Sequence, residues 1–195
     1  MFVAEGEDLV EAAAGVEPVD LLVAGESVEA SLLAEVSTLA HPPRVIGVYR
    51  RDALPRGTRP VTLALWHVAD PGNVGTLLRS ADAFGAGVAL SSGCADPTGP
   101  KALRASMGAL FRVPIVPFDE AAGRRVALVP QGGTPLAELE LGGDVVFVLG
   151  AEREGLPEEV LERCEVQASI PQQGESLNVA MAGTIALYEL SRRQA

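Results

Sequence analysis

Hydrophobic and polar positions alternate along the chain in a pattern that predicts short buried strands separated by helices. Nearly continuous apolar runs of five to nine residues are typical of strands that are buried on both faces. These runs are residues 61–69, 87–91, 113–118, 125–130, 144–150 and 166–171. Stretches with apolar residues at helical spacing lie between or after them, at 74–85, 100–110, 156–164 and 177–190. Strands that alternate with helices favour parallel pairing, so the pattern predicts an α/β fold with a mostly parallel sheet flanked by helices.

The first 60 residues repeat this alternation on a smaller scale and end in a segment with the composition of a linker, "ALPRGTRP" at 53–60. Proline, glycine and arginine in such density are typical of a connection between units. The sequence therefore predicts an N-terminal unit of residues 1–57 and a larger unit of residues 58–195. The first unit is small for an independent core, so it either packs on the rest or lacks part of its beginning.

Composition excludes several classes of protein. Hydrophobic residues make up 48% of the 195, which is enough for a packed core, but no apolar run is long enough to span a bilayer. The acidic first 15 residues are not typical of a signal peptide, so we expect a cytoplasmic protein without membrane contact. The two cysteines, Cys94 and Cys164, are far apart and only two histidines are present. We therefore expect neither a disulfide nor a metal site.

The net charge of −11 argues against broad, non-specific binding of nucleic acid. It conceals a local cluster of arginines, which are Arg44, Arg50, Arg51, Arg56 and Arg59. Arginine suits phosphate recognition, but a solvated linker with a biased composition explains the cluster equally simply. The charge pattern alone favours the solvated linker.

Polar residues and glycines gather in three loops that follow predicted strands, where ligands of parallel sheets usually bind. In "DPGNVGTLLRSADAFG" (70–85), Asn73 is a candidate helix N-cap, and Arg79 could form a surface pair with Asp82. In "LGAEREGLPEE" (149–159), Glu152 lies between two glycines. Each loop alone is compatible with an ordinary strand-to-helix turn.

The third loop belongs to "SIPQQGESLNVAMAGTIALYEL" (169–190). Ser176 is a candidate N-cap of an amphipathic last helix with Leu177, Met181, Ile185 and Tyr188 at helical spacing. Asn178 is harder to explain by helix formation alone. If its amide were buried without a hydrogen-bond partner, it would cost about 1–3 kcal/mol of stability. A surface asparagine in a first helical turn is the simple alternative.

Taken together, "NVGTLLR" (73–79), "GAEREG" (150–155) and "IPQQGESLN" (170–178) resemble the three motifs of the SpoU (TrmH-type) RNA ribose methyltransferases, which belong to the SPOUT superfamily. The resemblance covers residues 58–195 and includes the connecting segment 94–115. The N-terminal "FVAEGEDLVEAA" and "VDLLVAG" resemble the small L30e-like RNA-binding domain that often precedes this catalytic domain. The start of that domain is shorter than in relatives, so its grip on RNA is expected to be weaker.

The resemblance implies a C-terminal trefoil knot, a pocket for S-adenosyl-L-methionine and methyl transfer to a ribose 2′-hydroxyl of RNA. The positions that it places at the cofactor are Leu149, Gly150, Ile170 and Leu177. It implies that Arg79 is the central catalytic residue, while Asn73 and Glu152 orient it and the ribose. It places Ser176 and Asn178 at the loop and the substrate side. No metal is implied.

The resemblance also implies a homodimer formed through the catalytic domain, for which the apolar last helix is suited; packing within one chain is the alternative. The RNA substrate would be ribosomal RNA rather than transfer RNA.

A non-catalytic RNA-binding or ribosome-assembly factor with the same fold is a second hypothesis, which the intact Arg79, Glu152 and Asn178 disfavour. A small-molecule enzyme on a doubly wound sheet is a third, which the lack of a nucleotide-binding fingerprint disfavours.

Overall fold

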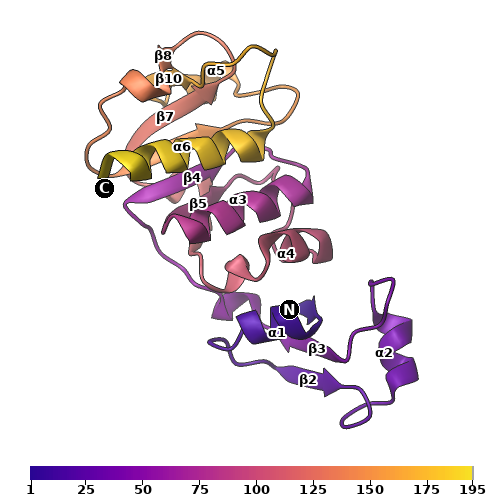
Figure 1. Cartoon of the computed structure of the whole chain (residues 1–195). Coiled ribbons are helices and arrows are strands. Elements are labelled where there is room, and N and C mark those ends of the chain that lie inside the picture. The colour runs from indigo at the N-terminus through magenta and orange to yellow at the C-terminus, as the bar shows by residue number, and fades with distance from the viewer. Residues whose placement is uncertain (195) are drawn as a thin grey trace.

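The computed structural model describes residues 1–194 and contains two sheets (Figure 1). The larger sheet has seven strands in the order β6-β5-β4-β9-β7-β10-β8, and every adjacent pair is parallel. Its strands are β4 (Val61–Leu65), β5 (Gly87–Leu90), β6 (Ile115–Pro117), β7 (Arg124–Val129), β8 (Thr134–Pro135), β9 (Val145–Leu149) and β10 (Val166–Ser169). The prediction of a mostly parallel α/β fold is confirmed; the short edge strand β8 was not predicted.

The apolar runs form the centre of this sheet. Strands β4 and β9 lie side by side, and every residue of β9 is buried. The helices that cover the sheet are α3 (Pro71–Ala83), α4 (Pro100–Ser106), α5 (Glu158–Leu161) and α6 (Val179–Gln194). Three short 3-10 turns, Ala109–Phe111, Phe118–Glu120 and Leu136–Glu138, complete the larger unit. Helix α6 runs beside α3 across one face of the sheet (Figure 1).

Gly75 explains why α3 and α4 pack so closely. A Cβ at this position would lie 2.3 Å from the carbonyl oxygen of Ala102 in α4, so only glycine permits the contact. The glycine of the first motif therefore serves helix packing, and the neighbour that it admits is a backbone.

The N-terminal unit contains a three-stranded antiparallel sheet in the order β1-β3-β2. Its elements are β1 (Phe2–Glu5), α1 (Glu7–Ala12), β2 (Asp20–Val23), α2 (Ala30–Val36), β3 (Val45–Tyr49) and the 3-10 turn Arg51–Ala53. The unit packs on the larger one through three rings. Tyr49 lies 5.2 Å and Phe2 5.9 Å from the ring centroid of Phe111, and all three side chains are buried.

Two members of the arginine cluster, Arg51 and Arg59, help to hold this connection together. Arg51 forms an ion pair of 2.7 Å with Asp96, and Arg50 pairs with Asp52 at 2.6 Å. Arg59 donates to the carbonyl of Gly85 at 3.2 Å. Within the described part of the chain, Arg44 and Arg56 are the members of the cluster without a side-chain hydrogen bond. Arg51 and Arg59 therefore have structural contacts that the interpretation of the cluster as a solvated linker did not predict.

Two features of the described residues concern membranes and metals. None of the helices in residues 1–194 is long and apolar enough to cross a bilayer. The same residues contain no group of three His, Cys, Asp or Glu side chains arranged to hold a metal ion.

Candidate cofactor and RNA site

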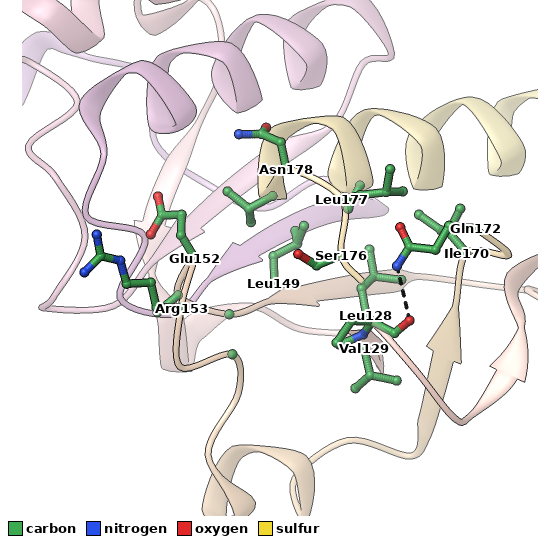
Figure 2. A pocket seen from close by; sticks show the side chains of 16 residues that line it. Leu128, Val129, Leu149, Glu152, Arg153, Ile170, Gln172, Ser176, Leu177 and Asn178 are labelled. Atoms are coloured by element: carbon green, nitrogen blue, oxygen red, sulfur yellow. Dashed lines mark hydrogen bonds between the residues drawn. The ribbon is translucent and has the colours of Figure 1, made fainter. Parts of the chain in front are cut away.

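The three polar loops converge at the carboxyl edge of the larger sheet, and the second and third of them line a cavity of about 310 Å³ (Figure 2). Its walls come from the ends of β7, β9 and β10 and from the start of α6. The lining residues are Leu128, Val129, Pro130, Leu149, Gly150, Ala151, Glu152, Arg153, Gly155, Ile170, Gln172, Ser176, Leu177, Asn178, Val179 and Ala182. The volume lies at the lower end of the range for small-molecule sites.

A chain of side-chain hydrogen bonds ties the three loops together. Asn73 donates from Nδ2 to Glu152 Oε1 at 2.9 Å, and Asn178 donates from Nδ2 to Asn73 Oδ1 at 3.0 Å. The backbone N–H of Asp70 also donates to Glu152 Oε1, at 3.3 Å. The direction of each bond is fixed, because the carboxylate can only accept and so turns the amino group of Asn73 toward itself. Each motif therefore supplies one member of a single polar chain.

The far end of this chain is a helix terminus. Asn178 Oδ1 accepts from the backbone N–H groups of Ala180 at 2.9 Å and Met181 at 3.3 Å, which makes Asn178 the cap of α6. The prediction that Ser176 caps this helix is wrong. Ser176 instead lies two residues before the cap, on an exposed stretch that lines the cavity.

The prediction that Asn73 caps α3 is also wrong. Asp70 is the cap, since its Oδ1 accepts from the backbone N–H of Asn73 at 3.0 Å. Pro71 occupies the first helical turn, where its missing N–H costs nothing, and so the helix begins earlier than expected. This shift leaves the Asn73 amide free to link Glu152 and Asn178.

The hydrogen bonds determine the charge state of Glu152. Partial burial acts to raise its pKa, but bonds from the Asn73 side chain and from the backbone N–H groups of Glu152, Asp70 and Ala69 outweigh burial. The pKa of Glu152 therefore lies below its ordinary value, and the side chain is a carboxylate at neutral pH. Such a group is a strong hydrogen-bond acceptor and a weak base.

Seven of the nine predicted site residues line the cavity. Leu149, Gly150, Ile170 and Leu177 form part of its wall, and Glu152, Ser176 and Asn178 stand at its rim or mouth. Gly150 is required by the shape of the loop, because a Cβ there would lie 2.3 Å from the backbone carbon of Gly155. Asn73 lies outside the lining but is bonded to two residues in it.

Arg79 is the predicted residue that the structure does not bring into this network. Its side chain is exposed, and within residues 1–194 it makes no side-chain hydrogen bond or ion pair. The suggested surface pair with Asp82 does not form, because Asp82 pairs with Arg112 at 2.7 Å. Arg79 is therefore a guanidinium group that is free to meet an anion.

The cavity contains residues that the motifs did not indicate. The end of β7 contributes Leu128, Val129 and Pro130, and the third loop contributes Gln172. The apolar run 125–130 is a predicted parallel strand, so the rule that ligands gather at carboxyl ends could have found the first three. Nothing in the sequence pattern distinguishes Gln172 from its neighbour Gln173.

The lining suits a nucleoside-like group. Leu128, Leu149 and Ile170 provide apolar walls for a flat ring, whereas Glu152 and Asn178 provide polar contacts (Figure 2).

Comparisons with known proteins agree with this geometry. An uncharacterized tRNA/rRNA methyltransferase of Synechocystis is 36% identical over 89% of this chain and 67% of its own length. The 23S rRNA (guanosine(2553)-2′-O)-methyltransferase RlmP of Bacillus subtilis is 30% identical over 97% of this chain and 88% of its own. Several mycobacterial relatives are longer, and the chain spans 52% of their length.

Solved structures extend the likeness to the fold. A TrmH-family protein from Porphyromonas gingivalis superimposes with a TM-score of 0.86 at 32% identity, covering 98% of this chain and 90% of that one. The SpoU methyltransferase AviRb from Streptomyces viridochromogenes, in complex with AdoMet, gives 0.84 at 26% identity, covering 99% and 90%. The family model described as "SpoU rRNA Methylase family" matches residues 60–188. The three converging motifs, the fold and this match show that the chain belongs to the SpoU rRNA methylase family.

Proposed function

We propose that this protein transfers a methyl group from S-adenosyl-L-methionine to a ribose 2′-hydroxyl of RNA. The observation that carries the proposal is the hydrogen-bonded chain Glu152–Asn73–Asn178, which joins all three motifs beside a cavity of cofactor size. The B. subtilis relative is a 23S rRNA 2′-O-methyltransferase and AviRb is a methyltransferase that binds AdoMet, and both support the same reaction class.

The walls of the cavity would hold the cofactor through Leu149, Gly150, Ile170 and Leu177. When bound, the cofactor supplies an electrophilic methyl group on a sulfonium. The chain's own residues have to position the ribose, and the proton of the 2′-hydroxyl passes to solvent water. Positioning two reactants in this way can contribute much of the rate. The loop 170–178 forms one wall of the cavity. This placement also supports the knotted path that the family resemblance implies.

Glu152 is proposed as a positioning residue rather than the base. Its lowered pKa makes it a poor proton acceptor, but the carboxylate holds the Asn73 amide in one orientation. Asn73 and Asn178 then present a fixed set of donors and acceptors toward the ribose, and Ser176 holds the loop on the substrate side.

Arg79 is proposed to bind an RNA phosphate and to stabilise the charge that develops on the 2′-oxygen. Its guanidinium is free of intrachain partners, and an arginine is too weak an acid to serve easily as a neutral base. Arg153, which lines the cavity, is a second exposed arginine without a side-chain partner in residues 1–194. Local cations of this kind allow RNA binding despite the net charge of −11.

We further propose that ribosomal RNA is the substrate, that residues 1–57 are an L30e-like RNA-binding domain, and that the enzyme is a cytoplasmic homodimer. The 23S rRNA relative supports the first, and the TrmH- and SpoU-type structures, whose likeness extends over the N-terminal unit, support the second. An exposed apolar face on α6 supports the third.

The test is tritiated methyl transfer to purified ribosomal and transfer RNA, followed by mapping of 2′-O-methyl positions. We expect label in ribosomal RNA.

The Arg79→Ala variant should lose at least about a hundredfold in methyl transfer while binding the cofactor normally, since Arg79 does not line the cavity. Arg79→Lys, which keeps the charge but not the forked geometry, should recover only part of the activity. Full activity of Arg79→Ala would contradict its assigned role, and no transfer by the unaltered protein would contradict the function.

A further inference from the structure

Residues 97–118 form a stretch of the chain that carries positive charge and no negative charge. They contain Lys101, Arg104 and Arg112 and no acidic residue, although the whole chain has 26 acidic and 15 basic residues. The first two cations belong to α4, and both side chains are exposed. The third, Arg112, is neutralised by its ion pair with Asp82 of α3. On a protein of net charge −11, α4 is therefore a local basic surface.

The first cation of α4 lies beside the candidate site. Lys101 Nζ is 3.1 Å from Asp70 Oδ2, and the backbone N–H of Asp70 donates to Glu152 Oε1 at 3.3 Å. Lys101 is thus one residue removed from the polar chain that joins the three motifs. Its pair with Asp70 is exposed, and such pairs contribute little to stability. Because a lysine ammonium is a point charge on a flexible stem, Lys101 can exchange this carboxylate for a phosphate of bound RNA.

The second cation of α4 lies against the N-terminal unit. Arg104 Nη1 donates to Thr38 Oγ1 at 3.2 Å. Thr38 is held in turn by the buried Glu5 of β1, which accepts from its backbone N–H and its hydroxyl. The partner of Arg104 is a neutral hydroxyl, so its charge is not cancelled by an ion pair within residues 1–194. A guanidinium has five N–H donors, and Arg104 keeps most of them for an anion.

The position of α4 places these two cations between the functional parts of the molecule. Helix α4 lies between α3 and the N-terminal unit, where it contacts β1 (Figure 1). Lys101 and Arg104 are three positions apart, so they lie on the same side of the helix. One of them reaches toward the polar chain and the other toward the N-terminal unit. Together they form a basic path from one to the other.

We propose that α4 is a surface over which the RNA substrate passes, and that Lys101 and Arg104 each bind a backbone phosphate of that RNA. The inference rests on the proposed function for the kind of ligand, because it takes RNA as the substrate. It connects the N-terminal unit to the ribose at the polar chain by a phosphate-binding surface. Contacts of this kind position the RNA without reading its sequence.

Phosphate contacts have a measurable signature in the salt dependence of binding. Each neutralised phosphate releases counterions and adds about 0.7–0.9 to the slope of log K against log salt concentration. Removing one cation of α4 should therefore reduce this slope by about that amount. It should also weaken RNA binding about three- to tenfold at low salt, to a similar extent for different RNA sequences.

The experiment uses the full chain and fragmented ribosomal RNA as the probe. Filter binding at several KCl concentrations gives Kd and the salt slope for the unaltered protein, Lys101→Gln and Arg104→Gln. Lys101→Arg and Arg104→Lys keep the charge, and thermal unfolding of all variants reports any change in the fold.

Arg163→Gln is the matched control, because it removes the same charge elsewhere. Arg163 is exposed and pairs with Asp119. It lies over the ring of Phe118, which belongs to the core on the opposite face of the sheet from α3 and α4.

We expect Lys101→Gln and Arg104→Gln to show the weaker binding and the reduced slope, and to raise KM for RNA in methyl transfer while kcat changes by less than about twofold. The charge-keeping variants and Arg163→Gln should bind RNA as the unaltered protein does. If the glutamine variants change Kd and slope no more than Arg163→Gln, α4 is not the RNA surface, and the proposed function stands. If the unaltered protein transfers no methyl group but the glutamine variants still lose affinity and slope, the proposed function is wrong and the α4 surface is supported.

Discussion

At the scale of single residues, Asn178 performs two tasks with the two ends of one amide. Its oxygen caps α6 by accepting from Ala180 and Met181, and its amino group donates to Asn73. The cap fixes the orientation of the amide, because only the oxygen can accept from the helix N–H groups. A structural requirement of the helix thus determines which group is presented to the first motif.

Substitutions of Asn178 can separate the two tasks. Asn178→Asp keeps an oxygen for the cap, and its charge suits a helix N-terminus, so stability should change by less than about 0.5 kcal/mol. Asn178→Ala removes the cap and should cost about 1 kcal/mol. Both lose the donor to Asn73 and should lose methyl-transfer activity. Urea denaturation and activity assays would show this; equal activity of Asn178→Asp and the unaltered protein would contradict the importance of the bond.

At the scale of elements, α6 has two apolar faces, and one of them is uncovered. Ala186, Leu187 and Leu190 are buried against the rest of the chain, whereas Met181 and Tyr188 are each 56% exposed. Leu177 and Ile185 are also exposed. Packing within the chain therefore does not account for this face, and an apolar stripe of this kind is typical of an interface.

The dimer that we propose on this face can be tested by placing a charge in it. Tyr188→Glu should weaken association by at least about tenfold, because a lone carboxylate would be buried in the interface. Leu32→Glu is a matched control, since Leu32 is 50% exposed on α2 of the N-terminal unit. Size-exclusion chromatography with light scattering should find a dimer for the unaltered protein and the control. A monomeric unaltered protein would contradict the proposal.

Helix α4 ends in a conformation that its sequence does not favour. Met107 terminates the helix with φ 49° and ψ 42°, in the left-handed region, and its side chain is 52% exposed. Glycine adopts this conformation without the steric cost that a side chain carries. Met107→Gly should therefore raise the free energy of unfolding by about 0.5–1 kcal/mol, after allowing for the greater freedom of glycine in the unfolded chain. Thermal unfolding would measure the effect, and a lower Tm would contradict it.

At the scale of the whole molecule, the N-terminal unit is attached to the larger one by both a core and polar contacts. The rings of Phe2, Tyr49 and Phe111 form the apolar part. The ion pair between Arg51 and Asp96 spans the connection at its surface. The hydrogen bonds from Arg51, and then those from Thr98, outweigh the effect of burial and lower the pKa of Asp96 to about 2.

This shift predicts how stability depends on pH. Because the folded-state pKa of Asp96 lies below its value in the unfolded chain, its contribution is present above about pH 4 and is lost as the pH falls toward 2. The pair is about half exposed, so we expect no more than about 1 kcal/mol. Urea denaturation between pH 2 and 6 should show Asp96→Asn less stable at pH 6 and equal at pH 2. A difference that persists at pH 2 would contradict this origin.

The sequence by itself determined the alternation of strands and helices, the parallel sheet and the three loops at its carboxyl edge, because local periodicity and turn residues encode them. The tertiary structure decided which groups meet there. Asn73 and Asn178 are 105 positions apart and Asp82 and Arg112 are 30 apart, so no local pattern could pair them. The bond from Asn178 to Asn73 and the free Arg79 follow from such distant contacts. Hydrogen bonding is short-ranged and directional, and it becomes readable only when the fold has placed the partners.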